Sequence, residues 1–169
     1  MRFFLKTGLI FYEYVLKYIY TYNKEGNMPS LFHMTEAAAI GIHACVMLGE
    51  EPGKSLSARQ IAEKLAVSYD HCVRVMHRLR QAGIVTSVRG PAGGFRLARP
   101  PQETTVLEIY EALEGKLEER RCLFREEHCR AGCLLFGELI DGINSLTKQF
   151  FEANNIASLV DKLNGGGNV

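Results

Sequence analysis

Apolar residues recur at three- and four-residue intervals along most of this chain, a spacing that predicts a mainly helical protein. The alanine-rich stretch 35–49 predicts one helix. A second helix begins after Ser57, because Ser57 and Gln60 can form a capping box, and it ends where the apolar pattern breaks over 66–68. We expect the alanine-rich helix to pack beneath the second helix and its successor.

A third helix is predicted from its N-cap at Ser68 to Gly83, a residue that suits a left-handed helix end. Its apolar stripe consists of Val73, Met76 and Leu79. The opposite side should be solvent-exposed, because it is polar and mostly basic. Its members are Asp70, Arg74, Arg78 and Gln81.

A short hairpin follows the third helix. Residues 84–88 are rich in β-branched side chains, 89–94 supply turn residues, and 95–97 return as a second strand that ends before Pro100. Two capped helices, a tight turn between them and a hairpin afterwards are the order of a winged helix-turn-helix. The usual ligand of that module is double-stranded DNA.

Charge is concentrated in the same region. The whole chain has a net charge of only +1, yet residues 59–99 carry eight basic side chains against two acidic ones. A basic helix of this kind fits the major groove, and a small wing tip fits the minor groove. The alternative interpretation is a solvated basic helix face. We predict base contacts for Asp70, His71 and Arg74, phosphate contacts for Arg78, Arg80, Arg96 and Arg99, and a minor-groove contact for Arg89, with Ser68, Tyr69 and Gly90 completing the DNA-binding set.

Two further helical stripes follow the hairpin. Thr105 and Glu108 form a second capping box, which opens a helix that ends at Gly115 and buries Val106, Ile109, Tyr110 and Leu113. A longer helix, stopping at Asn154, carries an apolar seam that needs a partner surface. Pairing with a second copy across a two-fold axis is the simplest solution, and folding back onto the same domain is the alternative. The seam residues are Leu135, Leu139, Ile143, Leu146 and Phe150.

Three of the five cysteines, Cys122, Cys129 and Cys133, cluster between these two helices. Neighbouring arginines would favour their thiolate forms, which bind metals. The spacing matches neither a zinc ribbon nor a ferredoxin run. Cys45 and Cys72 lie inside predicted helices and should be small buried apolar residues. This irregular cysteine usage, without a signal sequence, indicates a cytoplasmic protein whose thiols are ligands or sensors.

The helix-turn-helix, the wing residues 87–94, the three clustered cysteines and the closing segment 155–160 resemble the Rrf2 family of winged-helix regulators, which includes the IscR and NsrR sensors. The resemblance covers about residues 31–163. It implies a homodimeric, sequence-specific transcriptional repressor that binds a palindromic operator. It also implies an iron-sulfur cluster, 2Fe-2S or 4Fe-4S, whose redox, iron or nitric-oxide response changes operator affinity.

By the same resemblance, Cys122, Cys129 and Cys133 are the cluster thiolates. Phe136 stands about where IscR-type members have a histidine ligand, so the fourth ligand must come from elsewhere. Other members take it from the first helix of the partner subunit, which makes His43 and Glu36 candidates here, with His128 in the loop as a third. A thiol switch without iron, a zinc site and vestigial thiols are the alternatives.

The predicted fold class is mainly α with a small β-hairpin wing, a winged helix-turn-helix followed by a long dimerisation helix. The predicted parts are an aromatic extension over 1–27, a DNA-binding domain over 28–115, a cysteine loop over 116–133, dimerisation and C-terminal helices over 134–163, and a disordered tail over 164–169. Charges interrupt the extension, so no membrane span is expected. It is either a partner-binding segment or a start-site artefact. No catalytic machinery is visible, so we expect no enzyme. A protein-binding winged helix is the rival class.

Overall fold

The computed structural model describes residues 34–90, 93–117 and 137–165. Nearly all of the regular structure is helical, and one two-stranded antiparallel sheet forms the hairpin. The predicted fold class is therefore confirmed, and the predicted division into parts stays a prediction. The elements are α2 (Glu36–Glu50), α3 (Ala58–Leu65), α4 (Tyr69–Gln81), β1 (Val85–Val88), β2 (Gly94–Leu97), the 3-10 helix η1 (Pro101–Glu103), α5 (Val106–Glu114), α6 (Gly137–Ala153) and α7 (Ile156–Asn164).

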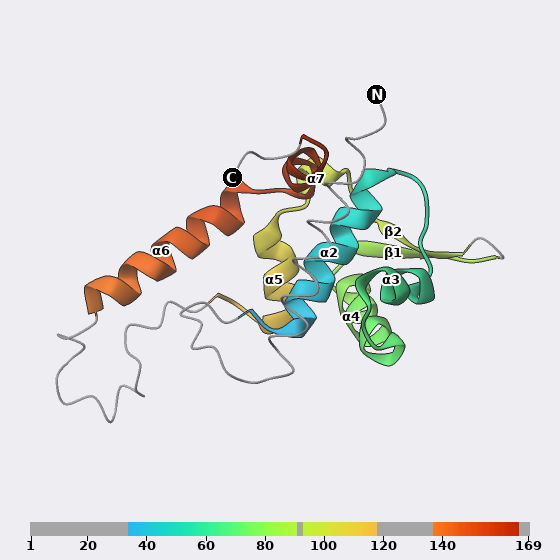
Figure 1. Ribbon diagram of the computed structural model, residues 1–169, viewed down its shortest axis with the longest axis horizontal. Helices are drawn as coiled ribbons and strands as arrows, with labels where there is room; N and C mark the ends of the chain where they lie inside the picture. The colour runs from blue at the N-terminus through green and yellow to red at the C-terminus, as the bar shows by residue number, and fades with distance from the viewer. Residues whose placement is uncertain (1–33, 91–92, 118–136, 166–169) are drawn as a thin grey trace, which may run out of the picture.

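Helix α2 lies at the centre of the domain, with α4, α5 and α7 packed around it (Figure 1). Two glycines allow this close packing. A Cβ atom at Gly41 would lie 2.3 Å from Cδ1 of Leu113 on α5, and one at Gly49 would lie 2.6 Å from Cγ2 of Ile156 on α7. Both neighbours are buried, so α2 approaches α5 and α7 only because these two positions lack side chains.

The helix-turn-helix follows its local signals. Ser57 and Gln60 make the predicted capping box, and Ser68 caps α4 by accepting from the backbone N–H of His71. Between the two helices Ala66 adopts a left-handed conformation, with φ of 54°. The end of α3 and the start of α4 thus each have a residue that satisfies backbone groups at the turn between them.

The buried stripe of α4 differs from the predicted one. Cys72, Val75, Met76 and Leu79 are buried, whereas Val73 is only half-buried. Met76 and Leu79 are buried as predicted, and Cys72 and Val75 extend the stripe, because residues three and four apart share one face of a helix that turns every 3.6 residues. In α5 the predicted set is buried apart from Tyr110, which is half-buried with its ring centroid 5.1 Å from that of Phe151.

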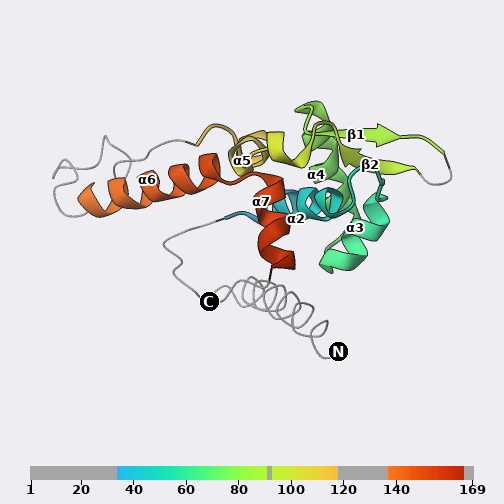
Figure 2. The same cartoon turned by 90° about the horizontal axis from the view of Figure 1, so that it is seen from above.

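The hairpin pairs Val85 with Leu97 and Val88 with Gly94, and Leu56 bridges to Phe95 on the outer side of β2. Gly94 has a φ of 159°, and a Cβ atom there would lie 2.4 Å from the backbone oxygen of Leu56. The backbone contact with Leu56 holds the hairpin against the segment leading into α3. The hairpin therefore projects from one end of the molecule, opposite to α6 (Figure 2).

Helix α6 projects from the body, and α7 turns back against α2 (Figures 1 and 2). Phe151 is the only buried residue among the described positions of α6. Leu139, Leu146 and Phe150 are 53, 70 and 48% exposed, and Ile143 is half-buried. The seam is thus not folded back onto its own domain. Leu135 lies outside the described residues.

A short junction joins α6 to α7. Asn154 accepts from the backbone N–H of Val106, and Thr105 bridges to Asn155. Asn155 and Ser158 form a capping box for α7. This helix runs to Asn164, so the tail predicted from residue 164 begins at least one residue too early; positions 166–169 lie outside the described residues, as does the extension 1–27. None of the described helices has the length and apolar character of a membrane span.

Candidate nucleic-acid interface

The outward face of α4 carries Asp70, Arg74, His77 and Gln81, all exposed. Their spacing of four, three and four residues places them on one side of the helix, opposite the buried stripe. No ion pair in the described part of the chain involves Asp70 or Arg74. This face offers donors and acceptors to a ligand. His77 was not among the predicted contacts, although the helical repeat counted from Asp70 and Arg74 points to it.

His71 lies on the flank of α4 that faces α2. Its side chain is 26% exposed, and its Nδ1 atom is 3.4 Å from a carboxylate oxygen of Glu36 at the start of α2. Glu36 is itself half-exposed. The structure therefore brings together one predicted DNA contact and one candidate metal ligand, which the sequence placed in separate sites.

Arg78 lies on the same flank and reaches α5. Its guanidinium donates to the backbone oxygen of Leu113 and, at 3.4 Å, to that of Ala112. These carbonyls belong to the last turn of α5, where a helix has no internal donors for them. The guanidinium that was predicted to meet a phosphate thus caps a neighbouring helix.

The opposite flank of α4 carries Tyr69 and Arg80. Tyr69 is 49% exposed, and Cζ of Arg59, in the first turn of α3, lies 5.4 Å from the centre of its ring. Arg80 is exposed in the last turn of α4. Both flanks of α4 therefore hold arginines, but their surroundings differ.

The wing places Arg89 and Gly90 at its exposed end, with Gly90 at a φ of 114°. Residues 91 and 92 lie outside the described part. Arg96 is exposed on β2, where it pairs with Thr86 in the ladder. Without an ion-pair partner among the described residues, Arg96 keeps its charge available on the hairpin surface.

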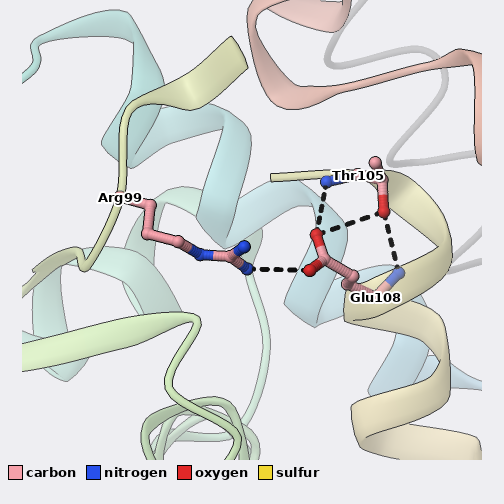
Figure 3. Close-up of polar contacts among 3 residues, drawn as sticks. All are labelled: Arg99, Thr105 and Glu108. Carbon is pink, nitrogen blue, oxygen red and sulfur yellow. Dashed lines mark hydrogen bonds and ion pairs between the residues drawn. The ribbon is translucent and has the colours of Figure 1, made fainter. Parts of the chain in front are cut away.

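Arg99 was also predicted to contact a phosphate, and the structure places it elsewhere. Its guanidinium donates to Glu108 at 2.9 Å (Figure 3). The same carboxylate accepts from the backbone N–H of Thr105 at 2.9 Å, within the capping box of α5. Burial raises the pKa of Glu108, but the bonds from Thr105 and Arg99 outweigh it and hold that pKa below the usual 4.5. Arg99 thus links the segment after β2 to the first turn of α5.

Cysteines 122, 129 and 133 and His128, the predicted loop ligands, lie outside the described residues. Cys45 and Cys72 are fully buried and unpaired, as expected. Burial raises the pKa of Cys45 to about 12 and that of Cys72 to about 11, which keeps both as thiols. In the described ranges, no three histidine, cysteine or acidic side chains converge as a metal site.

The cysteine loop begins beside the start of α2. Thr35, the N-cap of α2, donates to Glu114 at the end of α5, and the backbone N–H of Leu117 donates to Glu111 at 3.2 Å. His43 lies two turns into α2, with Nδ1 2.7 Å from the backbone oxygen of Ala39. Because that oxygen can only accept, Nδ1 is the donor in this contact.

Residues 34–162 match the Rrf2 family, described as an iron-dependent transcriptional regulator. The chain belongs to the Rrf2 family. This Rrf2 protein is 28% identical over 131 residues to the HTH-type transcriptional regulator NsrR of Shouchella clausii, with 75% of this chain and 87% of that one covered. BadM of Rhodopseudomonas palustris, named as an HTH-type transcriptional regulator, is 35% identical over 81 residues, which cover 48% of this chain and about half, 52%, of BadM.

Solved structures show the same fold. CymR, the global cysteine regulator of B. subtilis, superposes with a TM-score of 0.65 at 23% identity, over 78% of this chain and 98% of CymR. IscR of T. potens superposes with a TM-score of 0.64 at 21% identity, over 82% of this chain and 93% of IscR. This Rrf2 protein is therefore a winged-helix, DNA-binding transcriptional regulator and not an enzyme.

Proposed function

We propose that this protein is a homodimeric, cytoplasmic repressor that binds a palindromic operator and responds to redox state, iron or nitric oxide through a cluster held by its cysteine loop. The observation that carries the DNA-binding part is the exposed polar face of α4, whose Asp70 and Arg74 have no ion-pair partner in the described part of the chain. The wing adds the exposed cations Arg89 and Arg96.

In this proposal the first turns of α4 enter the major groove. Asp70, His71 and Arg74 contact base edges, because the N-terminal residues of a recognition helix lie nearest to them. Arg89 and Gly90 enter the minor groove, where narrow, negative sites attract arginine. Ser68, Tyr69, Arg80 and Arg96 contact the backbone. Arg78 leaves the proposed phosphate set, because its Nη2 group donates to two backbone oxygens of α5.

The dimer forms along α6. Leu139, Leu146 and Phe150 expose about half or more of their side chains on a projecting helix, which leaves apolar area for a partner to bury. A second copy presents the same seam and closes the assembly with two-fold symmetry. Two recognition helices related by such an axis suit a palindrome with half-sites one helical turn apart.

The proposed cluster ligands are Cys122, Cys129 and Cys133 with a fourth group from α2. His43 fits this role chemically, because a histidine whose Nδ1–H donates to a backbone oxygen presents Nε2 as the ligand atom. Glu36 is the other candidate on this helix. Three thiolates with an imidazole or carboxylate are a donor set that iron-sulfur clusters accept, and the bound cluster would supply the oxidisable, nitric-oxide-reactive iron.

Glu36 also gives the loop a connection to DNA recognition. Its carboxylate contacts His71 on α4. If Glu36 is the ligand, the same oxygen is withdrawn from His71, and that side chain is released for the groove. If His43 is the ligand, the contact between Glu36 and His71 persists.

DNA binding is tested by fluorescence anisotropy on a duplex selected from a random pool with the wild-type protein. Arg89→Ala should lose more affinity for this duplex than for a scrambled one, because minor-groove shape is read by that residue. Arg74→Ala should relax the preference at one base position by roughly 1–3 kcal/mol. An unchanged consensus after reselection with Arg74→Ala would remove that residue from base recognition.

The cluster is tested by absorption spectra and by iron and sulfide analysis of anaerobically purified protein. Visible charge-transfer bands should vanish when any one of the three loop cysteines is changed to alanine. Cys45→Ala and Cys72→Ala are matched controls that should keep them, because both thiols are buried in the helical core. Zinc in place of iron would indicate a structural site, and a metal-free protein whose DNA affinity changes on thiol oxidation would indicate a simple switch.

A further inference from the structure

Arg59 is a cation that the fold orients without neutralising. It is exposed in the first turn of α3, and its guanidinium carbon lies 5.4 Å from the ring centre of Tyr69 in the first turn of α4. No ion pair among residues 34–90, 93–117 and 137–165 involves Arg59. Glu63, one turn further along α3, is exposed and does not pair with it.

This arrangement separates Arg59 from two other arginines of the domain. Arg78 donates to the end of α5, and Arg99 donates to Glu108, so each of these guanidinium groups already has an acceptor within the domain. An aromatic face attracts a guanidinium, but it does not accept hydrogen bonds from the N–H groups that point outward in the plane of the guanidinium. The in-plane donors of Arg59 thus remain available, while the ring of Tyr69 limits the conformations of the side chain.

We propose that Arg59, positioned by Tyr69, binds a phosphate of the DNA backbone at the edge of the major groove that α4 enters. The proposal rests on the DNA-binding function above. In a helix-turn-helix the first helix crosses the backbone while the second lies in the groove, so the first turns of α3 and α4 together face one strand. A guanidinium fork matches a phosphate with two parallel hydrogen bonds.

A phosphate contact has a quantitative signature. It contributes equally to every sequence, and its loss reduces the slope of log affinity against log salt by about 0.9. Between 50 and 200 mM salt, the gap in affinity between wild type and Arg59→Ala should therefore narrow about 3.5-fold. At the lower salt concentration we expect Arg59→Ala to bind about tenfold more weakly.

The experiment measures anisotropy titrations over this salt range on two 30-base-pair duplexes, one selected from a random pool with the wild-type protein and one scrambled. Arg59→Ala should lose the same factor on both. Arg59→Lys should keep the wild-type slope with an intermediate affinity, since it retains the charge without the planar fork. Lys64→Ala is the matched control, because it removes an exposed cation from the other end of α3 and should change neither quantity.

The role of the ring is tested by comparing Tyr69→Phe with Tyr69→Leu. Phenylalanine keeps the aromatic face, so Tyr69→Leu should bind about two- to fivefold more weakly than Tyr69→Phe. This difference should disappear when Arg59 is alanine in both proteins. Thermal unfolding midpoints within about two degrees of wild type would show that folding is intact.

Wild-type affinity and slope in Arg59→Ala would overturn the proposal, and so would a loss confined to the selected duplex, which would mean base recognition. A difference between Tyr69→Phe and Tyr69→Leu that persists without Arg59 would remove the positioning role of the ring. If the wild-type protein shows no salt-dependent binding to either duplex, the proposed function itself fails.

Discussion

Arg78 and Arg80 belong to the same turn of α4, yet the structure predicts different effects when each is changed to alanine. Both interact with the helix dipole in the last turn, a contribution of about 0.3–1 kcal/mol for either. Only Arg78 also donates to the backbone oxygens of Ala112 and Leu113. Hydrogen bonds from a charged donor contribute about 1.5–3 kcal/mol, and exposure of the side chain reduces this, so we expect a net loss of about 1–2 kcal/mol for Arg78→Ala.

The free energy of unfolding should be measured by urea denaturation at one fixed protomer concentration, because a dimer's stability depends on it. Arg80→Ala should lose only its dipole contribution of about 0.3–1 kcal/mol. Its salt slope for DNA binding should fall by about 0.9, whereas Arg78→Ala should keep the wild-type slope. Equal destabilisation by the two changes, or an equal loss of salt slope, would refute the assignment of Arg78 to α5.

Three further changes test other contacts. Gly41→Ala gains about 1 kcal/mol in helix propensity, but its methyl group would overpack against Leu113 at a cost of about 1–3 kcal/mol. Urea denaturation should therefore show a net loss in the free energy of unfolding, and adding Leu113→Val should reduce that loss. Additive losses in the double variant would contradict the clash. Because the pKa of Glu108 is lowered in the folded state, its carboxylate stabilises the fold above pH 4.5, and this stabilisation is lost as the pH falls below that value. Glu108→Gln should therefore be less stable than wild type at pH 7 and should lose less stability between pH 5 and 3. Parallel curves of unfolding free energy against pH for the two proteins would exclude this role. Leu139→Asp combined with Ile143→Asp should give monomers in sedimentation and weak operator binding, and an intact dimer would mean that α6 is not the interface.

Local signals in the sequence were sufficient for the helix starts. Ser57 with Gln60 and Thr105 with Glu108 each form the complete capping box, because both partners lie within one turn and need no tertiary contact. The buried phase of α4 was less accessible. Cys72, Met76 and Leu79 were expected to be buried, but Val75 was not, because a three-residue repeat counted from Val73 does not include it.

Long-range partners could not be predicted. Arg78 and Leu113 are 35 positions apart, and nothing in either segment distinguishes Arg78 from Arg80 beforehand. The contact between Glu36 and His71 also depends on how α2 and α4 cross. In contrast, the place of His77 on the exposed face of α4 follows from the helical repeat of Asp70 and Arg74 alone.

The contact from Arg78 to α5 has a consequence for how this protein tolerates mutation. Its acceptors are main-chain oxygens, and every side chain at 112 and 113 that lets the helix form presents the same two atoms. Substitutions at those positions can therefore accumulate without breaking the contact, provided that Leu113 is replaced by a residue of similar volume. Only a substitution of Arg78 itself would remove this contact between α4 and α5, the helix that precedes the cysteine loop.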